Sequence, residues 1–232
     1  MGYLNGQAVI VTGAKGGLGT EVTKAFLDAG AKVAGVSRTI RNEDFPEPGF
    51  VAVPSEITSF DAARDAVARA EQHIGTVHTL VHLMGGWAGG QSVAETDDAT
   101  FENMLSMNLR SAFHMIRAVL PGMQSRKQGR ILAIGSKAAL EPQQNSGAYS
   151  ASKAALVSLI RTIALENRSR GITANIVLPG TIDTAANRAA MPNADVRKWV
   201  HPAQVAALLV HLASEEAAQV SGAVIPVYGQ DL

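Results

Sequence analysis

The chain has 232 residues, enough for one α/β domain with a single large core and little room for a second. Its 20 Lys and Arg residues balance 20 Asp and Glu residues, which argues against a nucleic-acid surface because such surfaces need clustered positive charge. Cysteine is absent, the six histidines lack metal-site spacing, and no apolar run reaches the ~18 residues of a membrane span. We expect a cytoplasmic protein without a metal or a membrane partner.

Short apolar runs alternate with longer amphipathic segments along the whole chain. Strands are expected at residues 8–12, 32–37, 50–54, 77–83, 130–135, 173–178 and 223–227. Helices are expected at residues 17–29, 59–74, 97–120, 148–170 and 202–213. This alternation is typical of βαβ units and a parallel sheet with helices on both faces. With no linker in sight, the sequence predicts one doubly wound α/β domain of about seven strands over residues 1–232.

One stretch, residues 179–201, shows neither a strand nor a helix pattern. It is longer than most connections in compact domains, and connections of this length usually form lids or binding loops. We therefore interpret it as an irregular substrate loop.

A glycine-rich segment, residues 12–19, lies where the first strand must turn into the first helix. Glycines there allow a tight turn and let a pyrophosphate approach the backbone, while the helix N-terminus offers free N–H groups. The alternative is a glycine-rich turn without a ligand. The position directly after an apolar strand favours a dinucleotide site in a Rossmann-type fold. Its candidate cofactor-binding residues are Gly13, Lys15, Gly17, Leu18 and Gly19.

The end of the second strand bears on which dinucleotide is bound. NAD-selective sites usually place an acid there to hold the ribose hydroxyls, whereas this chain has Ser37 followed by Arg38. Arg38 can pair with a 2′-phosphate, and Lys15 can add a second positive charge. The alternative is that both cations are merely solvated. We predict NADP (NADPH) as the cofactor in preference to NAD.

Tyr149 and Lys153 are four residues apart, so on a helix they project from one face. A free phenol titrates near pH ~10, and a nearby ammonium lowers that pKa toward the range useful for proton transfer. Ser136 follows an apolar strand, at the edge where open α/β sheets bind ligands. Alone, the Tyr-x-x-x-Lys pair is often an exposed helical pair; together with the glycine-rich turn it predicts a proton-transfer site.

In their order along the chain, the glycine-rich turn, Asn108, Ser136, Tyr149 and Lys153 resemble the motifs of the short-chain dehydrogenase/reductase family. The resemblance covers nearly the whole chain and implies a reaction in which hydride moves to or from a carbonyl-like carbon. It implies Tyr149 as general acid/base, Lys153 on the nicotinamide ribose and Ser136 on the substrate oxygen. Asn108 then supports a proton relay to Lys153.

Residues 178–184 resemble the family segment that borders the nicotinamide. The resemblance assigns cofactor contacts there to Pro179, Gly180, Ile182 and Thr184.

Two departures from the family pattern stand out. Where the family reads Asn-Asn-Ala-Gly, this chain reads His82-Leu83-Met84-Gly85, so the bracing of the sheet must be supplied differently although Gly85 still borders the cofactor. Glu56 stands near the place where the family has an Asp against the adenine.

A narrower resemblance links residues 85–90 and 183–199 to dihydropteridine reductase, a branch of the same family. Trp87, on a glycine-flanked loop, can stack on a flat heterocyclic substrate, or it can simply cover the core. Against a pterin substrate, that enzyme lacks the serine found here as Ser136 and carries the strand-end acid replaced here by Ser37.

Three hypotheses follow: an NADP(H)-dependent carbonyl reductase or alcohol dehydrogenase, a quinonoid dihydropteridine reductase, and a non-catalytic NADP(H)-binding regulator. Each takes a small-molecule ligand. The resemblance also implies a homodimer or homotetramer, formed through the predicted helices at residues 97–120 and 148–170.

Overall fold

The computed structural model describes residues 3–230, so the four terminal residues of the predicted domain lie outside it. Within these residues one parallel sheet has the strand order β3-β2-β1-β4-β5-β6-β7. The strands are β1 (Ala8–Thr12), β2 (Lys32–Ser37), β3 (Phe50–Pro54), β4 (Thr79–His82), β5 (Gly129–Ile134), β6 (Ile172–Pro179) and β7 (Val224–Val227). The predicted α/β, Rossmann-type doubly wound sheet of about seven strands is confirmed.

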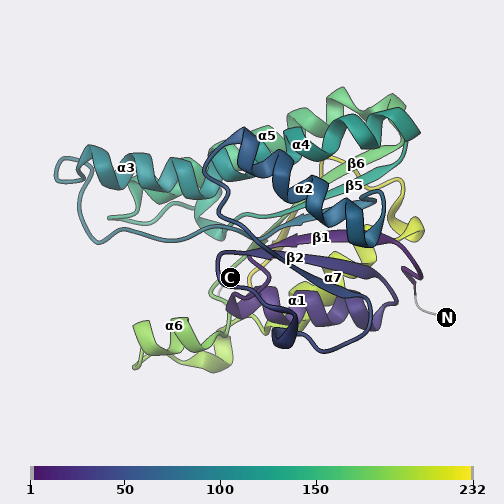
Figure 1. Ribbon diagram of the computed structural model, residues 1–232. Helices are drawn as coiled ribbons and strands as arrows, with labels where there is room; N and C mark the ends of the chain where they lie inside the picture. The colour runs from purple at the N-terminus through teal and green to yellow at the C-terminus, as the bar shows by residue number, and fades with distance from the viewer. Residues whose placement is uncertain (1–2, 231–232) are drawn as a thin grey trace.

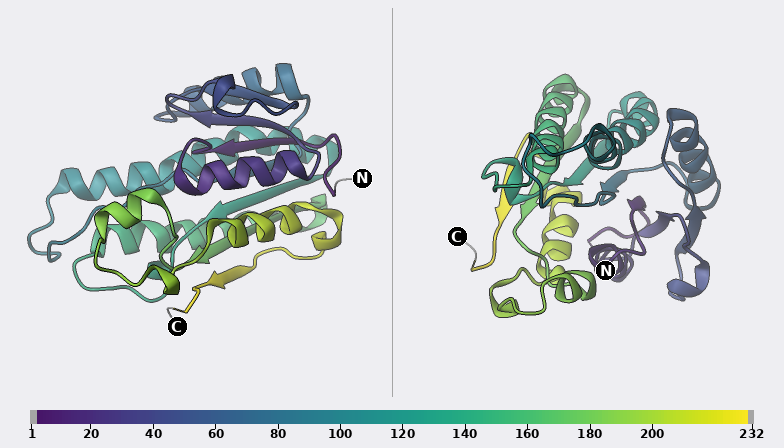
Figure 2. Two further views of the ribbon diagram at one scale, coloured as in Figure 1. Left: turned by 90° about the horizontal axis from the view of Figure 1, so that it is seen from below. Right: turned by 90° about the vertical axis from the view of Figure 1, so that its left-hand side faces the viewer.

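Helices cover both faces of this sheet (Figures 1 and 2). They are α1 (Gly17–Asp28), α2 (Phe60–Ile74), α3 (Asp98–Leu105), α4 (Ser111–Arg126), α5 (Gly147–Glu166), α6 (Ala185–Ala190) and α7 (Pro202–Ala213). Helices α2, α4 and α5 lie over one face, and α1 and α7 lie over the other. Successive strand residues therefore enter opposite cores: Ile10 packs on one side and Val9 on the other. In the part of the chain described, no helix is both long and apolar enough to cross a bilayer.

The continuous apolar strands were the easiest elements to predict. Strands β1, β2 and β3 and helix α7 have the predicted bounds. Helix α2 begins after Ser59, whose side chain accepts a hydrogen bond from the Ala62 N–H, and ends at Gly75 with φ of 83°. The alternation of short apolar runs with longer amphipathic segments therefore located most elements to within a few residues.

The long helix predicted at residues 97–120 is wrong in detail. The π-helical segment η2 (Ser106–Arg110) separates α3 from α4, and the Ser111 N–H donates to the Ser106 carbonyl five residues earlier. Helix α4 also continues through Pro121 to Arg126. The wider π turn inserts one extra residue, which changes the direction of the side chains around Asn108.

The predicted irregular loop at residues 179–201 contains helix α6, so that prediction is wrong for residues 185–190. The Thr184 side chain caps α6 by accepting from the Asn187 N–H. Ile182 and Val200 form a parallel bridge that ties the two ends of the loop together. Helices α6 and α3 both project beyond the carboxyl ends of the strands, at the left of Figure 1.

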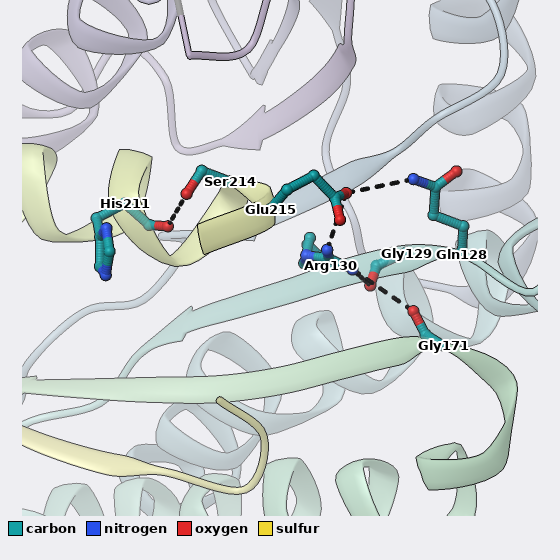
Figure 3. A network of polar contacts seen from close by, with 7 residues as sticks. All are labelled: Gln128, Gly129, Arg130, Gly171, His211, Ser214 and Glu215. Atoms are coloured by element: carbon teal, nitrogen blue, oxygen red, sulfur yellow. Dashed lines mark hydrogen bonds and ion pairs between the residues drawn. The ribbon is translucent and has the colours of Figure 1, made fainter. Parts of the chain in front are cut away.

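At the opposite end of the sheet, a buried arginine is paired with a largely exposed carboxylate (Figure 3). Arg130, 6% exposed, places Nη2 3.1 Å from Glu215 Oε1, and its Nη1 donates to the carbonyls of Gly129 and Gly171. Its Nε finds no partner among the described residues. Glu215 is thus the main counter-charge of a cation that water does not reach.

Substitution of Glu215 by Gln is expected to lower the free energy of unfolding by about 1–2 kcal/mol, because it leaves a buried guanidinium without a counter-charge. The Arg130→Met variant, which removes the buried charge as well, is expected to match or exceed the wild type. Urea denaturation of the three proteins measures both effects. An E215Q protein as stable as the wild type would contradict this account of the pair.

Candidate active site

The glycine-rich turn and the start of the loop at residues 179–201 meet at the carboxyl edge of the sheet. A Cβ on Gly17 would lie 2.8 Å from the Thr184 Cγ2, and one on Gly19 would lie 2.0 Å from the Gly13 carbonyl oxygen. Only glycine fits at these two positions. Strands β1 and β4 are neighbours, and the connections leaving them run to opposite sides of the sheet, which places this turn at the crevice where open α/β sheets bind ligands.

Other members of the predicted cofactor set lie around this edge. Leu18, the second residue of α1, is partly buried and packs against the core on that face of the sheet. Pro179 ends β6, and the Gly180 N–H donates to the Val227 carbonyl. Ile182 forms the bridge to Val200. The structure therefore brings residues 13–19 and 179–184 to one end of the sheet.

The cations predicted near the end of β2 are paired with carboxylates. Arg38 lies 3.7 Å from Glu56, and both side chains are largely exposed. The Lys15 Nζ lies 2.9 Å from the Asp44 Oδ2, and the hydrogen bond from Lys15 holds the pKa of Asp44 below its usual range. Asp44 was not singled out by the sequence, because its segment carries no motif. The half-buried Ser37 leaves the strand end without an acid.

Ser136 and Tyr149 come together although they lie on different elements. Ser136 lies two residues beyond the end of β5, and its Oγ accepts from the Ala138 N–H at 3.2 Å. Tyr149 lies in the first turn of α5, and its phenol is close enough to the Ser136 side chain for that group to act on the phenol pKa. Two hydroxyl groups therefore meet where a substrate oxygen can receive hydrogen bonds from both.

Lys153 lies one helical turn further along α5 and is 5% exposed. Its Nζ donates to the Ile134 carbonyl at 3.1 Å. A Cβ added to Gly85 would lie 2.7 Å from the Asn108 Oδ1 and 3.1 Å from the Lys153 Nζ. Asn108 and Lys153 therefore both approach the backbone of Gly85, and a side chain at that position would displace them.

The π-helical segment η2 presents Asn108, which is fully buried and well satisfied. The Gly86 N–H donates to its Oδ1 at 3.0 Å, and its Nδ2 donates to the Gly86 carbonyl at 3.1 Å and to the Ser152 Oγ at 3.0 Å. The Ser152 Oγ in turn donates to the Tyr149 carbonyl. Ser152 thus joins η2 to the turn of α5 that carries Tyr149, a role that its place in Tyr-Ser-Ala-Ser-Lys did not reveal.

The pKa directions differ from the sequence prediction. Burial raises the pKa of the Tyr149 phenol, against the opposing effect of the hydrogen bond with Ser136. Burial also lowers the pKa of Lys153 to about 8. The predicted lowering of the phenol pKa by the ammonium is therefore wrong for this structure, because Lys153 faces the Ile134 carbonyl and desolvation dominates at both groups.

His82 supplies the bracing that the altered Asn-Asn-Ala-Gly segment left open. It is fully buried, and burial lowers its pKa to about 3, with the Lys153 ammonium adding to the effect. The Thr12 Oγ1 lies 3.0 Å from its Nδ1, and the Ser111 Oγ lies 3.3 Å from its Nε2. Thr12 also accepts from the Leu83 N–H at 3.1 Å. A neutral imidazole therefore links β1, β4 and α4 beneath the site.

Trp87 lies on the loop that follows β4 and is 65% exposed. Its ring passes close to Gly89. The aromatic ring is thus accessible to a ligand. The alternative interpretation, in which Trp87 covers the core, does not fit this exposure. Among residues 3–230, no three His, Cys, Asp or Glu side chains gather as a metal ion would require.

Fold and site together define an oxidoreductase of nicotinamide-binding type. The model of the short chain dehydrogenase family matches residues 7–195, and the chain belongs to that family. The resemblance drawn from the motifs is confirmed at this level, and the chain is an enzyme rather than a regulator without turnover.

Individual relatives agree with this assignment. The 3-oxoacyl-[acyl-carrier-protein] reductase MabA of Mycobacterium tuberculosis is 35% identical, over 96% of this chain and 92% of the relative. The acetoacetyl-CoA reductase of Shinella zoogloeoides is 29% identical, over 96% of this chain and 97% of the relative. The crystal structure of gox2181 superposes with a TM-score of 0.91 at 27% identity, covering 98% of this chain and 96% of that chain.

Proposed function

We propose that the enzyme is an NADP(H)-dependent carbonyl reductase, or the corresponding secondary-alcohol dehydrogenase, with Asn108, Ser136, Tyr149 and Lys153 as its catalytic set. The observation that carries the proposal is the approach of the Tyr149 phenol to Ser136, one helical turn from the buried Lys153, whose Nζ donates to the Ile134 carbonyl at 3.1 Å. Ser136 lies just after β5, and Tyr149 and Lys153 lie on α5, so the fold brings two elements together at this place.

The residues present fit a dinucleotide. The glycines at 17 and 19 let the turn pack closely against Thr184 and Gly13, and the start of α1 that follows offers backbone N–H groups to phosphates. Ser37 and the exposed Arg38 favour NADP(H), since Ser37 stands where an NAD-selective site carries an acid and a guanidinium pairs well with phosphate. When bound, the nicotinamide supplies or accepts the hydride.

Each catalytic side chain has a task that its surroundings support. Tyr149 donates its phenolic proton to the carbonyl oxygen, because burial keeps the phenol protonated at neutral pH. Ser136 donates a hydrogen bond to the same oxygen and orients it. Lys153 is held by the Ile134 carbonyl to bind the nicotinamide ribose, and Asn108 fixes the Gly86 backbone beside it.

The names of the relatives favour one substrate class. Both reductases named above act on a 3-oxoacyl group carried as a thioester. We propose a 3-oxoacyl thioester as the first substrate to test, with the loop around α6 and the exposed Trp87 as the walls that decide what else is accepted.

The test measures oxidation of NADPH and of NADH at saturating concentrations of acetoacetyl-CoA, simple ketones, quinones and quinonoid dihydropterin. We expect turnover with acetoacetyl-CoA and a lower KM for NADPH than for NADH. A purified, folded enzyme that binds neither nucleotide would refute the proposal.

Quinonoid dihydropterin stays a second candidate because the exposed Trp87 ring offers a face on which a flat heterocycle can stack. That substrate needs no serine, so Ser136→Ala would leave its reduction intact while slowing ketone reduction. Turnover of the pterin by the S136A variant alone would reverse the order of the two candidates.

The proposed homodimer or homotetramer rests on apolar side chains exposed around α3, α4 and α5. Phe101, Phe113 and Leu165 are 42%, 46% and 72% exposed. Light scattering of the purified enzyme distinguishes these assemblies from a monomer.

A further inference from the structure

An ion pair links the glycine-rich turn to the segment that follows β2. The Lys15 Nζ lies 2.9 Å from the Asp44 Oδ2 and donates to the Thr39 carbonyl at 3.2 Å. The ammonium is therefore shared between the Thr39 backbone oxygen and the Asp44 carboxylate, both of which lie in the segment that follows β2. With Arg38, Lys15 is one of the cations near the place where the ribose of a dinucleotide binds in this fold.

The Asp44 carboxylate is fixed by the backbone. Asp44 closes the short helix η1 (Asn42–Asp44), where its Oδ2 also accepts from the Arg41 N–H at 2.9 Å. The Asn42 Oδ1 accepts from the Ala52 N–H at 2.8 Å, which ties η1 to β3. The carboxylate is thus held in place beside Lys15, and moving it would break a turn.

The second pair at this strand end is different. Arg38 and Glu56 are 3.7 Å apart, with side chains 75% and 62% exposed, whereas those of Lys15 and Asp44 are 40% and 26% exposed. An exposed pair at that distance contributes little and separates easily. Arg38 is therefore readily available to an incoming anion, while Lys15 is already engaged.

We propose that Asp44 is a specificity-determining residue that weakens binding of the 2′-phosphate of NADP(H) by holding Lys15. This rests on the proposed function. The carboxylate neutralises Lys15, one of the cations available to the phosphate. Asp44 has no such effect on NAD(H), which carries hydroxyl groups at that ribose. The preference for NADP(H) over NAD(H) is thus smaller than it would be with Arg38 and Lys15 present and Asp44 absent.

The Asp44→Asn variant tests the proposal with little disturbance of the fold. The amide oxygen can still accept from the Arg41 N–H, so the turn is kept while the negative charge is removed. Calorimetric titration measures the Kd of adenosine 2′,5′-bisphosphate and of adenosine 5′-monophosphate, and then of NADPH and NADH. We expect the bisphosphate and NADPH to bind about three- to tenfold more tightly to D44N, with the other two ligands unchanged.

Two further variants isolate the cause. In the double variant Lys15→Met with Asp44→Asn, the gain seen in D44N is expected to disappear, because Asp44 acts through Lys15. The Asp65→Asn variant is a matched control, since Asp65 forms a similar ion pair with Arg69, at 2.8 Å, on α2. It is expected to change no Kd.

The opposite result, weaker binding of the bisphosphate to D44N, would show that Asp44 orients Lys15 for the phosphate and would overturn the proposal. An equal gain for adenosine 5′-monophosphate would also overturn it, because the effect would not involve the 2′-phosphate. Should the wild type bind neither NADPH nor NADH, the proposed function fails as well. If the wild type binds NADPH and D44N binds it equally, only this inference fails.

Discussion

Replacement of Tyr149 by Phe is expected to lower kcat for carbonyl reduction by about 10³-fold while leaving the Kd of NADPH nearly unchanged. The phenyl ring keeps the packing of the first turn of α5 and loses only the hydroxyl that meets Ser136. Because the lost interaction is made in the transition state, kcat and kcat/KM are expected to fall together. Stopped-flow measurement of NADPH oxidation gives both values.

The pH dependence of the wild type follows from the same group. Burial raises the pKa of Tyr149, so the phenol is the protonated species at neutral pH and can donate without prior ionisation. Alcohol oxidation requires the phenolate, and its rate is expected to rise with pH throughout the alkaline range. The residual oxidation by Y149F should lack that rise.

A matched control removes a different phenolic hydroxyl. Tyr228 lies beside Gly180, because a Cβ on that glycine would be 2.9 Å from the Tyr228 carbonyl oxygen. The Tyr228→Phe variant is expected to retain wild-type turnover. Full activity in Y149F, in a protein shown by circular dichroism to be folded, would remove Tyr149 from the catalytic set.

The fold was predictable from sequence wherever a segment's environment is uniform. Strand β1 is buried on both faces, and four of its five residues are apolar, so its bounds can be predicted from the sequence alone. The break at η2 was not visible, because residues 97–120 keep a helical pattern across it. The π turn accompanies the contact of Asn108 with Gly86, and a local pattern does not record such a long-range contact.

The candidate site was predictable in part for a similar reason. The spacing of Tyr149 and Lys153 fixes their common helix face, but their pKa directions depend on how deeply the folded chain buries them. The resemblance suggested a partner for Asn108 but not the hydrogen bonds through Ser152 and Gly86. His82 and Asp44 contact residues of other elements, and neither belongs to a sequence motif from which its role could be predicted.

Substitution of Lys153 by Met is expected to abolish measurable turnover, a loss of at least ~100-fold, and at the same time to stabilise the fold. Lys153 is 5% exposed and has no carboxylate partner in the described part of the chain, so its charge is buried with the Ile134 carbonyl as its hydrogen-bond acceptor. Methionine fills a similar volume without a charge. The buried ammonium thus lowers the free energy of unfolding of the enzyme.

The sign of the effect with pH follows from the lowered pKa. Folding shifts the pKa of Lys153 from 10.5 to about 8, so the folded state binds this proton less tightly than the unfolded state does. The destabilisation is complete below pH about 8, fades as the pH rises, and vanishes above the unfolded value. After allowance for the lost hydrogen bond to Ile134, we expect K153M to be more stable by about 2 kcal/mol at neutral pH.

Urea denaturation of wild type and K153M near neutral pH and again near pH ~10 measures this difference. The stability advantage of K153M is expected to be large in the first condition and small in the second. Lys24→Met, which removes an exposed ammonium from α1, is expected to show no such change. If K153M were less stable than the wild type at neutral pH, the ammonium would be a net stabilising element of the fold. The trade of stability for catalysis at this position would then have to be abandoned, although the assignment of Lys153 to cofactor binding would still stand.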